Sequence, residues 1–187
     1  MTAQPPCPRC LFPAALCLCP EIPRLTSAVR VIVLRHASEI PRVTSTARWA
    51  ALALGAQIVD YGLPGAPPDL GVLAVPRAAL LFPTPRAPQV PLPRPLALVV
   101  PDGTWQQARR MVQRVPALRA LPRLALATPP PVTRIRRAPA GGMSTLEAIA
   151  AALAALGEGE AAARLSALHA AGVDRVRRWT GSRLAAA

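Results

Sequence analysis

The chain has 187 residues, 52% of them hydrophobic and only 3% aromatic, so its core must be built mainly from aliphatic side chains. All 22 basic residues are Arg, and with 9 acidic residues they give a formal net charge of +13. The longest strictly apolar run, Ala148–Leu156, is much shorter than the roughly 18–20 residues that cross a bilayer, which excludes a membrane-spanning helix.

The excess of positive charge predicts an acidic polymer as partner, because Arg makes planar, bidentate contacts with phosphates and stacks on bases. A genome rich in G and C would also favour Arg over Lys, but it explains the net excess of positive charge less well. The N-terminus has neither a basic start nor an apolar stretch, so no secretory leader is expected. These features predict a cytoplasmic protein without a membrane partner.

The first predicted element is a metal clip over residues 1–24, where four cysteines follow the pattern Cys-x-x-Cys-x6-Cys-x-Cys. In a reducing compartment closely spaced thiols favour a metal over disulfides, and four thiolates suit tetrahedral, structural Zn²⁺. A redox or iron–sulfur role and free thiols are the alternatives. The proposed ligands are Cys7, Cys10, Cys17 and Cys19.

The next segment predicts a strand, a helix and a second strand. Residues 29–36 are short and β-branched, residues 45–55 have helical spacing with Gly55 as a stop, and residues 56–61 are a second short apolar run. Residues 62–77 are rich in Gly and Pro and predict a loop.

The middle of the chain predicts three further strands. Residues 78–82 form the third strand, and six prolines in residues 83–95 predict a semi-rigid loop. Residues 96–100 show no polar alternation, which is typical of a parallel strand covered on both faces. A helix over 104–115, stopped by proline, and a fifth strand over 123–127 follow.

The C-terminal part predicts helices from Ser144 to about Leu156, from about Glu160 to the Gly172 region, and a last one ending near Trp179. Strands that alternate with helices predict an α/β fold with a mostly parallel sheet flanked by helices. Ligands of such sheets lie beyond the carboxyl ends of the strands. The loops of interest are therefore those after His36, Phe82, Val100 and Ala127.

Asp102-Gly-Thr-Trp105 lies where a buried strand passes into a helix. Asp102 has two interpretations, an N-terminal helix cap or a chemical group at the strand end. Trp105 either packs on the sheet or presents its ring to a ligand. The scarcity of Trp in the chain, which has three, favours the ligand interpretation.

Ser144-Thr-Leu-Glu147 has the spacing of a capping box, in which Ser and Glu satisfy the first N–H groups of a helix. The alternative is an anion site, because Gly141 and Gly142 before it let a ligand approach the backbone closely. The pattern His36-x-x-Glu39 has two interpretations, a surface contact or a catalytic or metal-binding pair. His169 lies among Ala and Leu, and no chemical role is expected for it.

These motifs, in this order, resemble those of the DTW-domain tRNA-uridine aminocarboxypropyltransferases. The resemblance runs from Cys7 to about Leu156 and combines the cysteine pattern, His-x-x-Glu, a Thr/Arg helix, Asp-x-Thr-Trp and Ser-Thr-Leu-Glu. Each motif alone is weak, but five in order are specific. The chain departs from the family at Ala37, where Pro is usual after His, and at Ser45, where Asn is usual before Thr.

The resemblance implies a SPOUT-like α/β fold with a knot on its C-terminal side, formed by a catalytic domain over residues 25–187 behind the zinc clip of residues 1–24. It implies transfer of the 3-amino-3-carboxypropyl group of S-adenosylmethionine to N3 of a uridine in tRNA, with methylthioadenosine as the other product. The expected partner is tRNA, and no obligate protein partner is expected.

The resemblance also assigns roles by position. Asp102 and Trp105 are the expected catalytic residues. The expected cofactor-binding residues are Phe82, Pro83, Pro101, Thr104, Gly142, Ser144, Thr145 and Glu147. The basic residues expected to contact RNA are Arg48, Arg109, Arg134, Arg136 and Arg137.

The chemistry requires that the donor's amino-acid arm face the RNA and that uridine N3 lose its proton. A helix that begins at Ser144 could fix the carboxylate of that arm, Asp102 could accept the proton, and Trp105 could stack on the base or the adenine. The alternatives are a SPOUT-type RNA methyltransferase, which would release adenosylhomocysteine, and a non-catalytic zinc-clip RNA-binding protein.

Overall fold

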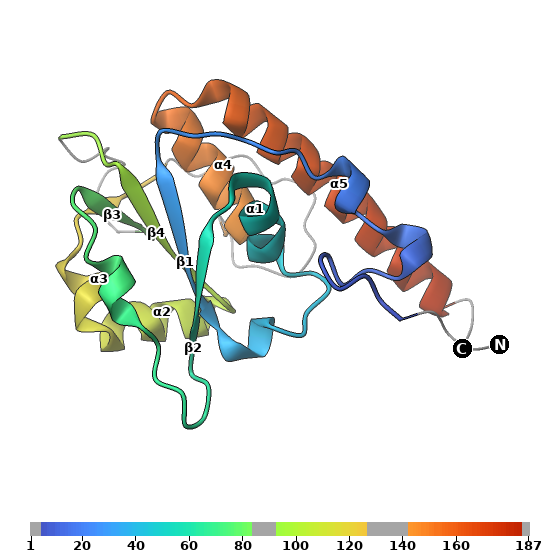
Figure 1. Ribbon diagram of the computed structural model, residues 1–187, viewed down its shortest axis with the longest axis horizontal. Coiled ribbons are helices and arrows are strands. Elements are labelled where there is room, and N and C mark those ends of the chain that lie inside the picture. Colours follow the sequence, from blue (N-terminus) through green and yellow to red (C-terminus); the bar gives the residue numbers. More distant parts are fainter. Residues whose placement is uncertain (1–4, 84–92, 127–141, 185–187) are drawn as a thin grey trace.

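A computed structural model describes residues 5–83, 93–126 and 142–184 of the chain. Within these residues five strands form one parallel sheet in the order β2-β1-β4-β3-β5 (Figure 1). The strands are β1 (Arg30–His36), β2 (Gln57–Tyr61), β3 (Ala78–Leu81), β4 (Ala97–Asp102) and β5 (Arg123–Leu124). The predicted α/β fold with a mostly parallel sheet is confirmed.

Two strands, β4 and β5, differ in length from the predicted ones, and the difference in β4 bears on function. The strand β4 continues beyond Val100 through Pro101 and Asp102, because both residues pair with the end of β1. Its last residue is therefore held by the sheet and does not lie in the loop. The last strand, β5, has only two residues where five are predicted.

Helices cover both faces of the sheet (Figure 1). One face packs against α1 (Thr46–Leu54), α4 (Thr145–Ala155) and α5 (Gly159–Leu184). The other face packs against α2 (Trp105–Arg114), α3 (Pro116–Ala120) and the short 3₁₀ helix η4 (Leu70–Leu73), which lies in the predicted loop of residues 62–77. Pro116 ends α2 as predicted, but it also begins α3, where a proline needs no N–H partner.

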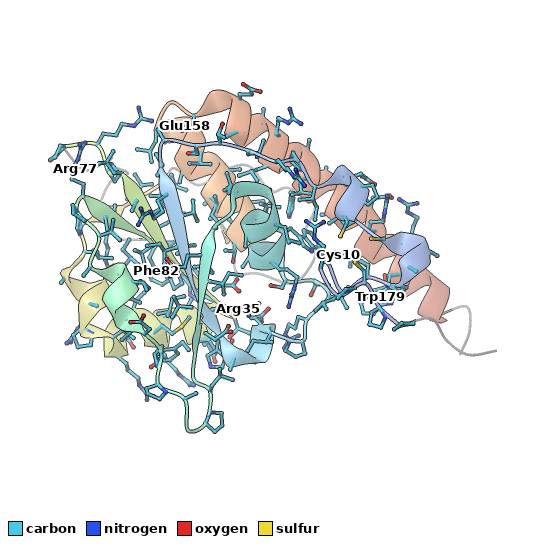
Figure 2. All side chains as sticks on the ribbon, viewed as in Figure 1. Cys10, Arg35, Arg77, Phe82, Glu158 and Trp179 are labelled. Carbon is cyan, nitrogen blue, oxygen red and sulfur yellow. The ribbon has the colours of Figure 1, made fainter. Side chains whose placement is uncertain are left out.

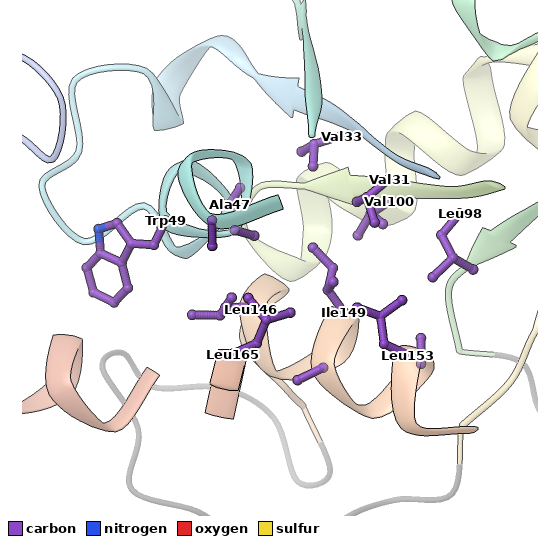
Figure 3. Close-up of a cluster of buried hydrophobic side chains, with 14 of the residues drawn as sticks. Val31, Val33, Ala47, Trp49, Leu98, Val100, Leu146, Ile149, Leu153 and Leu165 are labelled. Atoms are coloured by element: carbon purple, nitrogen blue, oxygen red, sulfur yellow. The ribbon is translucent and has the colours of Figure 1, made fainter. Parts of the chain in front are cut away.

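Side chains alternate between the two faces along each strand. Val31 and Val33 of β1 contact the α1, α4 and α5 layer, while Ile32 and Leu34 contact the α2 layer. Figure 3 shows Val31 and Val33 above Leu146 and Ile149 of α4. All of these side chains are nearly or completely buried, so they form the aliphatic core that the composition requires.

The cysteine-rich segment packs into the core on the α5 side of the molecule. Cys10, Phe12 and Leu18 are fully buried there, and the ring of Phe12 stacks on Trp49 of α1 with centroids 5.9 Å apart. Figure 2 places Cys10 on this side, away from α2 and α3. The described part of the clip, residues 5–24, therefore shares its hydrophobic core with the remainder of the chain.

The prediction that one helix ends near Gly172 and a separate one follows is wrong, because α5 is a single helix over Gly159–Leu184. A Cβ atom at Gly172 would lie 2.1 Å from Cζ3 of Trp49. Gly172 therefore allows α5 to approach the buried indole ring. It contributes to packing and does not terminate the helix.

The expected knot depends on residues 84–92 and 127–141, which lie outside the described residues, and it stays a prediction. The proline-rich loop of residues 83–95 and the basic turn at Arg134, Arg136 and Arg137 also lie largely or wholly outside them. Within the described parts of the chain, no helix combines the length and the apolar character needed to cross a membrane.

Replacing Gly172 tests its role in helix packing. We expect Gly172→Ala to lower the free energy of unfolding by about 1–3 kcal/mol, because the added methyl group overlaps Trp49. The matched control is Gly181→Ala in the same helix, where no atom lies within 4 Å of the added Cβ. This control gains helix propensity of up to about 1 kcal/mol. Chemical denaturation of both variants measures the difference, and equal stability gains would contradict the packing role.

Candidate active site

The carboxyl ends of β2, β1 and β4 bring three charged residues together. Arg35 is the register partner of Asp60 on β2 and of Asp102 on β4. Its Nε and Nη2 atoms donate to the two carboxylate oxygens of Asp60 at 2.7 and 3.0 Å. In Figure 2 Arg35 lies at the lower end of the sheet, where β1 ends. This bidentate pair fixes the guanidinium group of Arg35 against β2, on the strand next to that of Asp102.

Asp102 is 5% exposed and joins the two motifs that the sequence analysis singled out. The hydroxyl group of Thr145 donates to Oδ1 of Asp102 at 2.6 Å. The strand β4 supplies the carboxylate, and the first residue of α4 supplies the hydroxyl group. Residues that are far apart in the sequence therefore meet at one edge of the sheet.

Asp102 does not cap a helix. The N-cap of α2 is Thr104, whose Oγ1 accepts from the N–H of Gln107 at 3.4 Å. Gln107 completes a capping box, because its Oε1 accepts from the N–H of Thr104 at 2.8 Å. The helix-cap interpretation of Asp102 is wrong, and its carboxylate instead faces α4.

The capping-box interpretation of Ser144 and Glu147 is confirmed. Oγ of Ser144 accepts from the N–H of Glu147 at 3.3 Å, and Oε2 of Glu147 accepts from the N–H of Ser144 at 2.8 Å. The N–H groups of Thr145 and Leu146 take no part in this box. Among the described residues they have no other acceptor, so they can serve as donors to an anion.

Behind the capping box lies a buried histidine. Nε2 of His169 lies 3.6 Å from Oε2 of Glu147, and the histidine is almost completely buried on α5. Burial lowers the pKa of His169 below its usual value, while the carboxylate of Glu147 acts in the opposite direction. His169 therefore packs behind the start of α4 as a mainly neutral group.

Trp105 and Phe82 form an aromatic pair at the same edge of the sheet. Their rings stack with centroids 5.4 Å apart and an interplanar angle of 15°. Trp105, at the start of α2, is 43% exposed, and Phe82 directly follows β3. The pair combines one supported face with an exposed indole ring, which suits stacking on a base.

The other expected cofactor residues differ in accessibility. Pro83 is exposed beside the aromatic pair and Gly142 is half-buried before α4, so both can face a ligand. Pro101 is buried in β4, where it pairs with Leu34. It can therefore affect a bound ligand only indirectly, through the shape of the end of β4.

The four cysteines have the spacing of a metal site. Their sulfur atoms all lie within 4.8 Å of one another, with Cys7 and Cys19 at 3.6 Å and Cys10 and Cys17 at 3.8 Å. A tetrahedral metal with metal–sulfur bonds of about 2.3 Å requires sulfur atoms about 3.8 Å apart. This cluster can therefore hold a metal ion.

The thiols of this cluster differ in acidity before a metal binds. Backbone hydrogen bonds from Cys10 and Arg9 lower the pKa of Cys7 to about 6. Burial raises the pKa of Cys17, and burial together with the neighbouring sulfur of Cys7 raises that of Cys19 to about 12. Only a cation placed among the sulfur atoms would stabilise all four thiolates.

Two of the arginines expected to bind RNA are described. Arg109 is exposed on α2, one turn beyond Trp105. Arg48 is only half-exposed, and its Nη2 donates to the carbonyl group of Ile40 at 2.6 Å. Arg48 can therefore offer a phosphate only part of its guanidinium group, while Arg109 is open to one.

Four further residues near the site are not among the predicted site residues: Arg35, Asp60, Ser38 and Gln107. A charged residue at position 35, directly after the apolar run of residues 31–34, is a signal for the first of them. The partnership of Arg35 with Asp60 depends on the pairing of β1 with β2, which no local pattern reveals. The sequence around Gln107 is that of an ordinary helix. Its role in the capping box becomes evident only when Thr104 is identified as the N-cap of α2.

Comparisons with known proteins support one family. The family described as DTW domain matches residues 4–177. The chain is 34% identical, over 178 residues, to the tRNA-uridine aminocarboxypropyltransferase 2 of Drosophila melanogaster, an alignment that covers 83% of this chain and 70% of the fly protein. No solved structure matches.

Replacing Thr145 tests its contact with Asp102. We expect Thr145→Val to lower the free energy of unfolding by about 1–3 kcal/mol, because it removes a hydroxyl donor from a buried carboxylate at nearly constant volume. Thr145→Ser keeps the donor and is the matched control. Chemical denaturation at neutral pH measures both variants. A valine variant as stable as the serine variant would show that the hydrogen bond contributes nothing.

Proposed function

The chain belongs to the DTW-domain family, and we propose that it transfers a 3-amino-3-carboxypropyl group to N3 of a uridine in tRNA. The observation that carries this proposal is the hydrogen bond between Asp102 and Thr145. It joins the Asp-Gly-Thr-Trp turn to the start of α4, so the residues proposed as proton acceptor and as anion site lie at one edge of the sheet.

The proposed donor is S-adenosylmethionine, which supplies an aminocarboxypropyl carbon that is electrophilic because it is bonded to a sulfonium. The bond from N3 to this carbon forms as the carbon–sulfur bond breaks, and methylthioadenosine leaves with the sulfur. The protein must therefore hold the amino-acid arm, orient it toward the base and accept the N3 proton.

The start of α4 fits the carboxylate of the donor's arm. Ser144 and Glu147 satisfy each other in the capping box, which leaves the N–H groups of Thr145 and Leu146 and the positive end of the helix dipole. Gly142 precedes this turn and has no side chain to block the approach. Glu147 acts on the donor indirectly, because it orders the turn.

The aromatic pair fits a flat ring of either substrate. Phe82 supports one side of Trp105, whose exposed indole ring can stack on the adenine or on the uracil base. Pro83, next to Phe82, continues this surface. The tRNA phosphates are expected to contact exposed Arg109 and the basic residues at 134, 136 and 137, which makes binding depend steeply on salt.

Asp102 is the proposed proton acceptor. Uridine N3 carries a proton and is a poor nucleophile until it loses it. The carboxylate of Asp102 is buried at the end of β4 and is oriented by the hydroxyl group of Thr145. Arg35, held by Asp60, places a positive charge on the neighbouring strand.

We also propose that the fold is SPOUT-like, with a knot on its C-terminal side. In this proposal residues 1–24 form the zinc clip and residues 25–187 form the catalytic domain. The alternative of a methyltransferase on a similar fold predicts a different product. Methylthioadenosine would support aminocarboxypropyl transfer, and adenosylhomocysteine would support methyl transfer. Salt-dependent RNA binding without either product would support a non-catalytic RNA-binding protein.

The proposed metal is structural Zn²⁺, held by all four cysteines. The sulfur spacing matches a closed tetrahedral site, which leaves no position for substrate. Cys10 and its neighbours Phe12 and Leu18 are buried in the same core as Trp49. A metal ion would therefore stabilise the α5 side of the core and take no part in the chemistry at the sheet edge.

Elemental analysis and thermal unfolding test the metal. We expect about one Zn²⁺ per chain, and Cys17→Ser should lose it and unfold at the same lower temperature as the chelator-treated wild type. Because burial raises the pKa values of Cys17 and Cys19, metal binding must displace protons, so the apparent affinity should fall as the pH falls. Purified protein without metal and with four titratable thiols would contradict the assignment.

Asp102→Asn tests the proton acceptor. We expect the single-turnover rate with saturating donor and tRNA to fall by about 10²–10⁴-fold, as for the loss of a general base. RNA affinity should change little, because phosphate contacts come from arginines. The matched control is Asp69→Asn, an exposed aspartate that caps η4 and takes no part in the contacts of Asp102.

Two results would change the role of Asp102. A wild-type single-turnover rate in Asp102→Asn would place the base elsewhere. A collapse of donor affinity with normal folding would make Asp102 a binding residue for the donor. Measuring affinity and rate on the same preparations separates these outcomes.

A further inference from the structure

His36 lies at the carboxyl end of β1, directly beside the Asp-Gly-Thr-Trp turn. It is half-buried and faces the α2 side of the sheet. A Cβ atom at Gly103 would lie only 3.2 Å from Cβ of His36. The absence of a side chain at Gly103 therefore allows the imidazole ring to sit next to the turn that carries Asp102.

One ring nitrogen of His36 is committed to the protein. Nδ1 accepts from the backbone N–H of Ser38 at 3.2 Å, and it lies 2.9 Å from the hydroxyl oxygen of Ser38. That hydroxyl oxygen accepts from Nε2 of Gln107 at 3.1 Å, so its own hydrogen is free to point at Nδ1. The amide of Gln107 is oriented in turn by the N–H of Thr104, which donates to its Oε1.

These contacts determine the tautomer of the neutral ring. A backbone N–H can only donate, so Nδ1 must present its lone pair. The ring proton then lies on Nε2. Within the described residues no atom accepts from Nε2, and a Cβ atom at Gly62 would lie 3.8 Å from it. His36 therefore presents one oriented N–H donor near the proposed site of transfer.

The geometry points to His36 as a catalytic residue that recognises the uracil base through a hydrogen bond from Nε2–H to a carbonyl oxygen next to N3. When N3 loses its proton, the negative charge spreads onto O2 and O4, so a fixed donor at either oxygen stabilises the reacting anion. This inference rests on the proposed function, and it assigns a second role at the same site.

The same network excludes His36 as the proton acceptor. Nδ1 already receives two donors, and Nε2 already carries the ring proton, so neither nitrogen can take the N3 proton. Asp102 and His36 lie on opposite faces of the sheet edge, since they continue the Val100 and Leu34 rows respectively. In the proposed arrangement the uracil ring lies across the end of the sheet, between these two groups.

Single-turnover rates as a function of pH test the hydrogen bond, with the full-length protein and a tRNA that the wild type modifies. We expect His36→Phe to reduce the rate about 10²-fold near neutral pH, as for the loss of one oxyanion donor. The deficit should shrink as the pH rises, because uridine then loses its N3 proton without help. His36→Gln restores a donor and should recover part of the rate.

Two thio-substituted tRNAs identify the oxygen. Sulfur is a weak acceptor, so 4-thiouridine or 2-thiouridine at the target position should remove most of the difference between wild type and His36→Phe. The substitution that does so marks the contacted oxygen. A difference that persists unchanged with both thio-tRNAs, an equal deficit at every pH, or an unimpaired His36→Phe overturns the inference.

Nitrogen chemical shifts of the free protein provide a readout that does not depend on activity. We expect a protonated Nε2 and an unprotonated Nδ1 in His36, and a mixture of tautomers in Ser38→Ala. A protonated Nδ1 in the wild type overturns the inference. If the wild type forms no methylthioadenosine with any tRNA, the proposed function fails, whereas an active wild type with an unimpaired His36→Phe refutes only the role of His36.

Discussion

The parallel pairing of β1 with β4 positions the centre of the candidate active site. Its register continues to the last residue of β4, so Asp102 is held by the sheet and lies opposite Arg35. The next residue of β1 is His36, which meets the glycine that follows Asp102. A shift of this register by one residue would turn Asp102 toward α2 and away from Thr145, because alternate residues face opposite sides of the sheet.

The structural and functional interpretations of the Ser-Thr-Leu-Glu motif are compatible, because its members have different tasks. Ser144 and Glu147 satisfy each other and begin α4. Thr145, between them, directs its hydroxyl group at Asp102. The division repeats in the Asp-Gly-Thr-Trp turn, where Thr104 and Gln107 cap α2 while Asp102 faces the other helix. Each motif thus orders a helix start and contributes one further side chain to the hydrogen bond between Thr145 and Asp102.

The sequence predicts the strands well, because a buried parallel strand reads as a short apolar run between turns. The sequence also predicts the start of α4, because a capping box is formed by residues that are close together in the sequence. The prediction of a helix end at Gly172 is wrong. A glycine is needed there because the ring of Trp49, a residue far away in the chain, packs against the helix at this position. The sequence also fails for Asp60 and Gln107, whose partners are set by strand pairing and by packing of α2.

The groups suited to N-alkylation of a uracil lie on different faces of the sheet edge. On the α4 side, a carboxylate beside a helix start suits proton acceptance and binding of an anionic arm. On the α2 side, an exposed indole ring and an oriented imidazole N–H suit a flat base with carbonyl groups. In the function proposed above, the donor's arm would therefore lie on the α4 side and the base on the α2 side of the end of β4. Transfer of the arm rather than the methyl group would require that this arrangement align N3 with the carbon of the arm.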